Sequence, residues 1–388
     1  MFAATVLSTL IVAASHMQFQ RHEIDVYPGG YQVAVADLNG NGRLDVVALS
    51  TDANRVDWYE NPTWKRRPIA TIDQPIDLAI HDIDLDGRPE IALASGFYFG
   101  QSTRGGEIQW LKAKANLDEP WTIHPIGKAP VTHRVRWVDL DGDGRVELVH
   151  APIFGPGSKG VQAPKPAHLW GFRPPKDLGR GQWEAWEIDE TLTVLHGIWA
   201  GRLNGTGRDQ LLTASYEGIY QFRYEGDYPS GNWTKVCISR GAEPEGKTPG
   251  TSQGSSEVVA GRLGSGRNFI AAIEPWHGNE VVVYTPDTSS HWQRHVLDST
   301  LSEGHVLVVA DFDDDGDDEI VAGWRGGGGG LTLYDMMDGD SLQFDSLSLD
   351  RGIAAEGAVA ADINADGRLD LVVNAGRTKN LVWYENRR

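Results

Sequence analysis

Residues 135–151 read VRWVDLDGDGRVELVHA, in which an apolar run leads into a short acidic turn and a second apolar run follows. Six further stretches have the same form: VAVADLNGNGRLDVVAL (33–49), LAIHDIDLDGRPEIALA (78–94), IWAGRLNGTGRDQLLTA (198–214), VVAGRLGSGRNFIAAIE (258–274), LVVADFDDDGDDEIVAG (307–323) and AVAADINADGRLDLVVN (358–374). Consecutive turns begin 45 residues (Asp37 to Asp82) to 63 residues (Asp139 to Arg202) apart. Four short strands fit this spacing, which is typical of one β-propeller blade.

Two more strand-like runs follow each repeat, the second of them beginning with an aromatic residue. That last run is present in six repeats, because the chain stops inside the seventh. The missing run stands at the other end, where FQRHEID (19–25) reads almost like WQRHVLD (292–298). The sequence therefore predicts an all-β fold, a seven-bladed β-propeller over residues 18–388 whose N-terminal strand closes the last blade. Such a closure removes the open sheet edges that invite aggregation.

Composition limits the class of protein and its compartment. A formal net charge of -19 argues against nucleic acid, whose recognition needs a basic surface. The single cysteine, Cys237, excludes an internal disulfide. An apolar run at 2–14, long enough for a signal-peptide core and too short to span a bilayer, makes 1–17 a candidate leader. We therefore expect a secreted or periplasmic protein without a membrane span, although a disordered start is the alternative because no basic residue precedes the run.

Five of the seven turns carry carboxylate or amide oxygens at positions 1, 3, 5 and 9, with glycine at position 6. Alternating oxygens on a tight turn converge on one point, and calcium takes six to eight oxygen ligands. The predicted calcium ligands are Asp37, Asn39, Asn41 and Asp45; Asp82, Asp84, Asp86 and Glu90; Asp139, Asp141, Asp143 and Glu147; Asp311, Asp313, Asp315 and Glu319; and Asp362, Asn364, Asp366 and Asp370. The alternative is a set of polar turns that bind no metal.

The turns of blades 4 and 5 depart from this pattern. Arg202 and Arg262 replace the first aspartate, and the other ligand positions are depleted. A guanidinium supplies a fixed positive charge where an ion would otherwise sit. We expect both turns to be free of metal.

The repeated turn resembles the FG-GAP or VCBS repeat, which occurs in integrin α-chain propellers and in many secreted bacterial proteins. The resemblance covers essentially the whole chain after the leader. It implies the propeller fold and says little about function, because the same fold serves adhesion modules, lectins and lyases.

Three histidines share one register at the start of the first strand of their blades. Counting six residues back from the first turn position reaches His133, His196 and His305, and in blade 7 it reaches Glu356. With 12 histidines in 388 residues, fewer than one is expected at seven positions. Each blade directs this register toward the axis, so we expect a central site for zinc or another divalent metal. The alternative is a polar lining in which the imidazoles bind water and one another.

The same face should carry the groups that bind a substrate. An aromatic ring beside a titratable group suits a sugar, and Trp276 followed by His277 is such a pair, although an exposed turn is the alternative. The candidate substrate-binding residues are Tyr31, Tyr98, Lys159, Trp276 and Glu257.

Four segments resemble the propeller domain of the aldos-2-ulose dehydratase family and, in outline, the seven-bladed polysaccharide lyases. They are HRVRWVDLDGDGRVELVHAPIFG (133–155), HGIWAGRLNGTGRDQLLTASYEG (196–218), EPWHGNEVVVY (274–284) and EGHVLVVADFDDDGDDEIVAG (303–323). In that family the propeller accompanies cupin domains, and the reaction eliminates water from a keto-sugar. The sequence here has no cupin, so we expect any isomerase activity housed there to be missing.

These features together predict a metal-dependent sugar lyase or dehydratase that carries out β-elimination on a keto-sugar or a uronate-type saccharide. A metal would polarise the carbonyl or carboxylate oxygen. Arg325 or Arg134 would add positive charge, and His277 or Tyr216 would act as the base. The alternative is a non-catalytic FG-GAP propeller that binds carbohydrate or protein.

Overall fold

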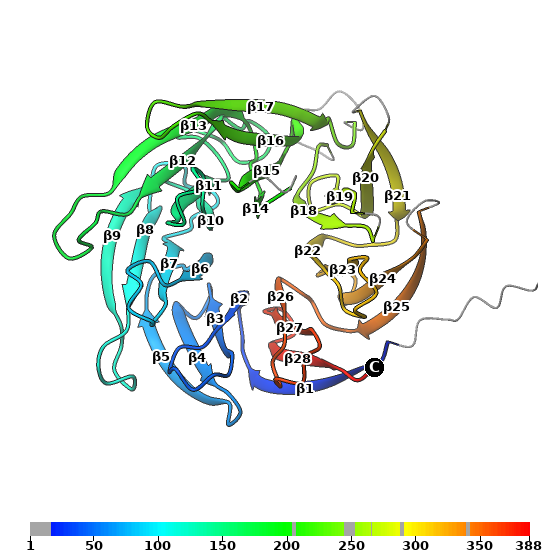
Figure 1. Ribbon diagram of the computed structural model, residues 1–388, viewed down its shortest axis with the longest axis horizontal. Helices are drawn as coiled ribbons and strands as arrows, with labels where there is room; N and C mark the ends of the chain where they lie inside the picture. The colour runs from blue at the N-terminus through cyan, green and yellow to red at the C-terminus, as the bar shows by residue number, and fades with distance from the viewer. Residues whose placement is uncertain (1–16, 204–206, 244–252, 265, 288–290, 339–341) are drawn as a thin grey trace, which may run out of the picture.

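The computed structural model describes residues 17–203, 207–243, 253–264, 266–287, 291–338 and 342–388. These residues form seven four-stranded antiparallel sheets placed around a central axis (Figure 1). The prediction of a seven-bladed β-propeller is therefore confirmed. The predicted leader, 1–17, lies outside the described residues apart from Met17.

Each blade is a meander whose first strand lies nearest the axis. Blade 1 comprises β2 (Gly30–Ala36), β3 (Asp45–Ser50), β4 (Arg55–Glu60) and β5 (Lys65–Thr71); blade 2 comprises β6 (Asp77–His81), β7 (Glu90–Ser95), β8 (Glu107–Lys112) and β9 (Thr122–Lys128). Blade 3 comprises β10 (Thr132–Val138), β11 (Glu147–Pro152), β12 (Ala167–Arg173) and β13 (Glu184–Leu192); blade 4 comprises β14 (Gly197–Gly201), β15 (Gln210–Ser215), β16 (Gly218–Glu225) and β17 (Asn232–Ser239). Blade 5 comprises β18 (Glu257–Arg262), β19 (Asn268–Glu274), β20 (Glu280–Pro286) and β21 (Trp292–Asp298); blade 6 comprises β22 (Gly304–Ala310), β23 (Glu319–Trp324), β24 (Gly330–Asp338) and β25 (Gln343–Arg351). Blade 7 comprises β26 (Gly357–Ala361), β27 (Asp370–Ala375), β28 (Asn380–Asn386) and β1 (Phe19–Val26).

The N-terminal strand β1 closes the ring by pairing with the C-terminal strand β28. The antiparallel register runs from Phe19 opposite Asn386 to Val26 opposite Asn380. In Figure 1 the blue β1 lies along the outside of the red blade. The closure predicted from residues 19–25 is confirmed, and the strand extends one residue further.

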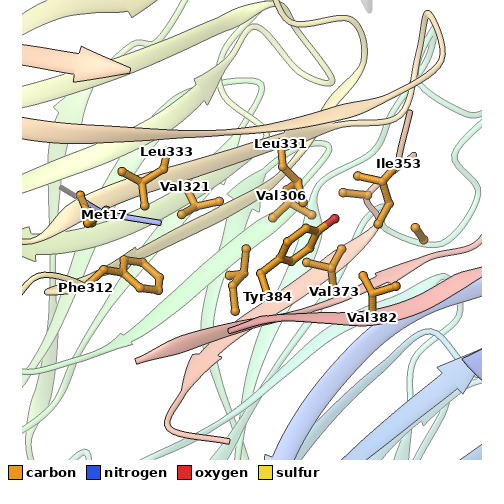
Figure 2. Close-up of a cluster of buried hydrophobic side chains, with 13 residues drawn as sticks. Met17, Val306, Phe312, Val321, Leu331, Leu333, Ile353, Val373, Val382 and Tyr384 are labelled. Carbon is orange, nitrogen blue, oxygen red and sulfur yellow. The ribbon is translucent and has the colours of Figure 1, made fainter. Parts of the chain in front are cut away.

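The second strand of each blade is buried along almost its whole length, as in β3, β7 and β11. Both faces of these strands are covered by the neighbouring blades, which explains why their sequences read as nearly continuous apolar runs. Seven apolar clusters fill the spaces between neighbouring blades. Figure 2 shows the cluster between blades 6 and 7, where Met17 packs beside Phe312 and Tyr384 takes part in the same core.

The innermost strands place the two kinds of predicted site on opposite faces. In blade 6, His305 lies at the start of β22, whereas the acidic turn begins at Asp311 directly after the end of that strand. The innermost strands of neighbouring blades contact one another around the ring. The histidine register therefore lies on one face of the propeller and the acidic turns on the other. Within the described residues, no helix is long and apolar enough to cross a membrane.

Candidate active site

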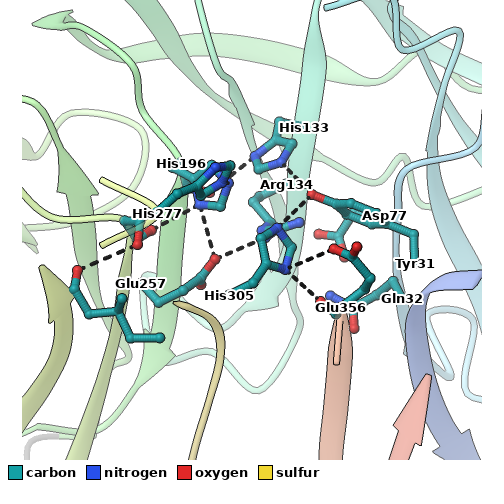
Figure 3. A network of polar contacts seen from close by, with 12 residues as sticks. Tyr31, Gln32, Asp77, His133, Arg134, His196, Glu257, His277, His305 and Glu356 are labelled. Carbon is teal, nitrogen blue, oxygen red and sulfur yellow. Dashed lines mark hydrogen bonds and ion pairs between the residues drawn. The ribbon is translucent and has the colours of Figure 1, made fainter. Parts of the chain in front are cut away.

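Four histidines meet on the propeller axis, at the face where the innermost strands begin (Figure 3). His133, His196 and His305 come from the register predicted from the sequence, and all three are buried. His277 reaches them from the turn between β19 and β20, with its Nε2 atom 2.9 Å from the Nε2 atom of His196. Its backbone is left-handed (φ 46°), a conformation that costs energy for a residue other than glycine.

The backbone of the next blade sets the tautomer of three of these imidazoles. The Nδ1 atom of His133 donates to the carbonyl of His196 (3.1 Å), and that of His196 donates to the carbonyl of Ser256 (3.0 Å). The Nδ1 atom of His305 donates in the same way to the carbonyl of Glu356 (2.8 Å). Because a carbonyl only accepts, Nδ1 carries the proton in each ring. All three therefore keep an unprotonated Nε2, as histidine ligands of metals usually do.

His277 has the opposite tautomer. The guanidinium of Arg325 donates to its Nδ1 atom (3.1 Å), and a guanidinium has no acceptor. The proton of a neutral His277 therefore lies on Nε2, from which it donates to the Nε2 atom of His196.

The cluster holds more nitrogen lone pairs than protons to satisfy them. The hydroxyl of Tyr31 lies 3.2 Å from the Nε2 atom of His133 and 3.1 Å from that of His305, but it has one proton to give. The Nε2–H group of His277 satisfies His196. Counted over the described residues, one of the two Nε2 lone pairs that face Tyr31 lacks a proton, and a metal ion or a water O–H group can satisfy it.

All four imidazoles are neutral near pH 7. Burial lowers the pKa of His133, His277 and His305 well below the usual 6.5, and nearby positive groups, Arg134 and Arg325 among them, lower it further. Burial also lowers the pKa of His196, although the Glu257 carboxylate offsets part of the effect. Neutral imidazoles are the form that binds metals and accepts protons.

Two ion pairs flank the histidines. Arg134 donates to Glu257 (3.0 Å) and Arg325 donates to Glu356 (2.8 Å). Burial raises the pKa of Glu257, but Arg134 and His196 more than compensate, so its pKa lies below the usual value. For Glu356 burial prevails over Arg325, and its pKa is raised. The first carboxylate is therefore held ionised, and the second is the better proton donor.

His196, His277 and His305 are the three side chains whose ligand atoms come close enough for one ion, with all of them within 4.8 Å of one another. In a tetrahedral zinc site, ligand nitrogens about 2.0–2.1 Å from the ion lie roughly 3.4 Å apart, which this group can satisfy. His133 lies beside His196, with ring centroids 4.5 Å apart and the rings tilted by 49°, but its Nε2 atom faces Tyr31. The donor set thus suits a transition metal, and His277 is closer to it than the sequence indicated.

A cleft of about 540 Å³ opens beside the histidines. Its lining includes Tyr31, Arg325 and Glu356 together with the aromatic residues 97–99, of which Phe97 lies beside His133 with ring centroids 5.7 Å apart. This volume is adequate for a small sugar, since ligand pockets commonly range from about 300 to 1,000 Å³.

The other predicted substrate residues lie at different distances from this centre. Tyr98 lines the cleft, where its hydroxyl pairs with Asp73. Trp276 stacks on His277, with ring centroids 4.2 Å apart. Tyr216 packs edge-on against Trp276, and burial raises its pKa to about 12, so it is a poor base at neutral pH. Lys159 is exposed in a blade 3 loop, outside the described lining of the cleft.

Sequence reasoning missed Glu303, which completes the ion-pair network together with Arg377. Glu303 accepts from Arg325 (3.3 Å) and from Arg377 (2.8 Å), and Arg377 also donates to the carbonyl of Arg325. Glu303 lies two residues before His305, so the histidine register was the available signal for it. The pairing with Arg377 of the next blade depends on how the blades are arranged.

The acidic turns adopt the conformation that their sequence predicts. The glycine at position 6 has a positive φ in all five turns, for example 94° at Gly316. In blade 5, the backbone N–H of Arg262 donates to Asp318 of the neighbouring blade (2.6 Å), and in blade 4 Arg202 lies 3.7 Å from Asp209. Calcium in the five acidic turns stays a prediction.

Comparisons with known proteins agree with the fold and point to one family. The profile for "Aldos-2-ulose dehydratase, beta-propeller domain" matches residues 105–287, and the FG-GAP-like repeat matches 37–93 and 311–373. The aldos-2-ulose dehydratase of Phanerodontia chrysosporium is 26% identical over 368 residues, covering 87% of this chain and 39% of the dehydratase. The chain thus spans about two fifths of the length of that relative.

Other matches are shorter or more distant. Integrin alpha pat-2 of Caenorhabditis briggsae is 30% identical over 131 residues, which is 31% of this chain and 11% of the integrin. A crystal structure of BBS1N in complex with ARL6DN has a TM-score of 0.57 and 12% identity, covering 95% of this chain and 96% of that one. That likeness concerns the fold alone. The chain is a seven-bladed β-propeller of FG-GAP-like repeats that resembles the propeller domain of aldos-2-ulose dehydratase.

Proposed function

We propose that this protein is a metal-dependent lyase that eliminates water from a neutral keto-sugar. The observation that carries the proposal is the convergence of His196, His277 and His305, with an unsatisfied lone pair nearby, beside a cleft of sugar size. The related propeller belongs to a protein named aldos-2-ulose dehydratase, which supports the same class of substrate.

The three histidines would hold the ion, zinc being the best match for an imidazole set. Bound there, the ion would supply Lewis-acid polarisation of the substrate's carbonyl oxygen. Binding it requires His277 to give up the Nε2 proton that it now donates to His196, and the contact between Arg325 and Nδ1 of His277 to rearrange.

The surrounding residues account for the proton transfers of an elimination. Tyr31 lines the cleft, and burial raises its pKa to about 12, so its hydroxyl is neutral. With a pKa this high the hydroxyl is no base by itself, but it can relay the proton beside the carbonyl to the neutral Nε2 atom of His133, 3.2 Å away, which acts as the base. Glu356, with its raised pKa, can protonate the departing hydroxyl so that it leaves as water. A C–H and a C–O bond break, and a C=C bond forms.

The charges of the cleft favour a neutral sugar over a uronate. Its lining contains two guanidinium groups, Arg325 and Arg377, and two carboxylates, Asp52 and Glu356. Glu303 accepts from both arginines, so Glu303 and Asp52 balance the two guanidinium groups even when Glu356 carries the proton that it donates. No positive charge is therefore left unbalanced for a substrate carboxylate among these residues. The aromatic wall can stack on the apolar face of a sugar ring.

The carboxylates also favour elimination over glycoside hydrolysis. Hydrolases use two carboxyl groups at a set separation on either side of the bond. Here Glu257 and Glu356 are each tied to an arginine on the axis. Glu257, held by Arg134 and outside the described lining of the cleft, is therefore not available as the second carboxylate of such a pair.

A non-catalytic binding propeller is the second candidate. The match to integrin alpha over 131 residues favours it, because it shows that the repeats themselves are shared with an adhesion protein. Binding of a sugar would then survive loss of the central histidines.

Elemental analysis and an ultraviolet assay test the proposal together. Purified protein should contain about one equivalent of zinc or another transition metal. Incubation with a keto-sugar such as anhydrofructose should produce the absorbance of an enone, and a uronate polysaccharide should produce little. His196→Ala and His305→Ala should lose both the metal and the activity.

The matched control is His295→Ala, which removes a histidine on the outer strand β21 that bonds Thr285 and should change neither readout. Full activity in both central variants would overturn the proposed site. Absence of turnover on every keto-sugar, with sugar binding retained in those variants, would instead support the binding propeller.

A further inference from the structure

Three of the acidic turns, in blades 2, 3 and 6, end in a buried glutamate held in the same way. One carboxylate oxygen of Glu90 accepts from the backbone N–H of Ile83 (3.1 Å), and one of Glu147 from that of Leu140 (3.2 Å). Likewise, Glu319 accepts from Phe312 (2.6 Å). All three glutamates are at most 1% exposed. The second oxygen of each points back into its turn and needs a partner of its own.

In blades 2 and 3 that partner is a cationic side chain from the end of the third strand. The Nζ atom of Lys112 lies 2.8 Å from Glu90, 2.5 Å from Asp84 and 2.9 Å from Asp86. An ammonium group thus sits among the carboxylates expected to bind calcium.

Arg173 does the same in blade 3. Its guanidinium donates to Glu147 (2.9 Å) and also pairs with Asp141. The two cations occupy equivalent places in their blades. In blade 2 the second residue of the second strand pairs with Leu111, and Lys112 follows Leu111 in the chain. In blade 3 the second residue of the second strand pairs with Phe172, and Arg173 follows Phe172.

Blade 6 has a carboxylate at this place. Tyr334 is paired with Ile320, so the equivalent residue is Asp335, which is 4% exposed. Oε1 of Glu319 and Oδ1 of Asp311 are buried without a hydrogen-bond partner in the described part of the chain. Asp311, Asp313 and Asp315 bring their oxygens within 4.8 Å of one another, as do acidic groups in the turns of blades 2 and 3, so the difference between the turns lies in the third-strand residue and in the unpartnered oxygens.

We propose that Lys112 and Arg173 replace the calcium expected in the turns of blades 2 and 3, and that the blade 6 turn, where Asp335 stands in their place, is the one left able to hold the ion through Asp311, Asp313, Asp315 and Glu319. Three aspartates with converging oxygens, together with the buried Oε1 atom of Glu319, suit calcium, which takes six to eight oxygen ligands. Buried carboxylate oxygens without partners are otherwise strongly unfavourable. Fewer than five turns are then expected to hold calcium, and all of them lie on the face opposite the histidines.

The turns of blades 1 and 7 end in an aspartate, where those of blades 2, 3 and 6 end in a glutamate. Both oxygens of Asp45 accept backbone N–H groups, from Leu38 and Asn61, and Asp370 is held in the same way. A metal in these turns would rely on the earlier positions. Differences in metal content between variants therefore isolate blades 2 and 6.

The test counts calcium per protein by native mass spectrometry after equilibration with calcium and removal of the excess. Glu319→Gln should lose one equivalent relative to the unmutated protein. Glu90→Gln, the same substitution at the equivalent place in blade 2, should lose none. Lys112→Glu, which gives blade 2 the carboxylate that blade 6 has, should gain one equivalent.

Thermal unfolding with and without calcium gives an independent readout. Binding to the native state raises the melting temperature by mass action, so the shift should shrink in Glu319→Gln and persist in Glu90→Gln. If Glu319→Gln does not fold, Asp313→Asn removes a ligand more gently and should show the same loss. Unchanged calcium content in Glu319→Gln or Asp313→Asn, or an equal loss in Glu90→Gln, would overturn the proposal.

Discussion

Removal of strand β1 should open the propeller ring. A variant lacking residues 1–26 is compared with one lacking 1–16, so that the difference reports on residues 17–26. Strand β1 pairs with β28 through seven residue pairs. In an antiparallel ladder this corresponds to about seven backbone hydrogen bonds, each contributing a net ~0.5–1.5 kcal/mol, or roughly 4–10 kcal/mol together.

The loss also uncovers apolar surface. Met17, which is 4% exposed, and Phe19, whose ring lies 5.9 Å from that of Phe312, pack on the core between blades 6 and 7. Since a domain is stable by about 5–15 kcal/mol in total, the shorter variant should be largely unfolded or should associate through the exposed edge of β28.

Urea unfolding followed by tryptophan fluorescence measures the effect, and size-exclusion chromatography detects association. A synthetic peptide of residues 17–27 added in trans should raise the unfolding midpoint of the shorter variant, because it can pair with the free edge. If the two truncated proteins unfold at the same urea concentration, the closure contributes little and the reasoning is wrong.

Three further predictions concern buried polar groups. Asn374 donates from its side chain to the carbonyls of Gln32 and Leu49, so Asn374→Ala should lower the free energy of unfolding by ~1–3 kcal/mol in urea denaturation, whereas the exposed Asn116→Ala should not. Arg134→Met should lower the free energy of unfolding by ~3–5 kcal/mol, because it removes the guanidinium partner of the Glu257 carboxylate. Adding Glu257→Gln should restore much of that stability, and no recovery in the double variant would contradict the pairing. Burial lowers the pKa of His150 to about 3, so below pH 6.5 the unfolded chain gains a proton that the native protein does not. Stability should therefore fall with pH by up to ~1.4 kcal/mol per unit between pH 6.5 and 3, and this slope should be smaller in His150→Gln.

The repeat pattern made the fold predictable from the sequence. Each blade is a local meander, so strand order and turn position follow from segments of about fifty residues, as do the acidic turns at Asp37 or Asp362. The closing strand was also predictable, because residues 19–25 resemble a fourth strand that the last repeat lacks. The histidine register followed from the same periodicity, since equivalent positions of all blades face one axis.

Contacts between strands and between blades were decided by the tertiary structure. The position shared by the innermost strands indicated His133, His196 and His305, but His277 comes from a turn whose path brings it beside His196. The tautomers depend on which carbonyl of the next blade each ring meets, which no local pattern encodes.

The acidic turns show the same division. Their spacing predicted five equivalent calcium sites, whereas the turns of blades 2, 3 and 6 differ in a third-strand residue that lies more than twenty residues away in blades 2 and 3. Whether that residue is Lys112 or Asp335 can be read from the sequence. That its side chain reaches the turn follows only from the pairing of the strands, because strand register determines which side chains converge on a point.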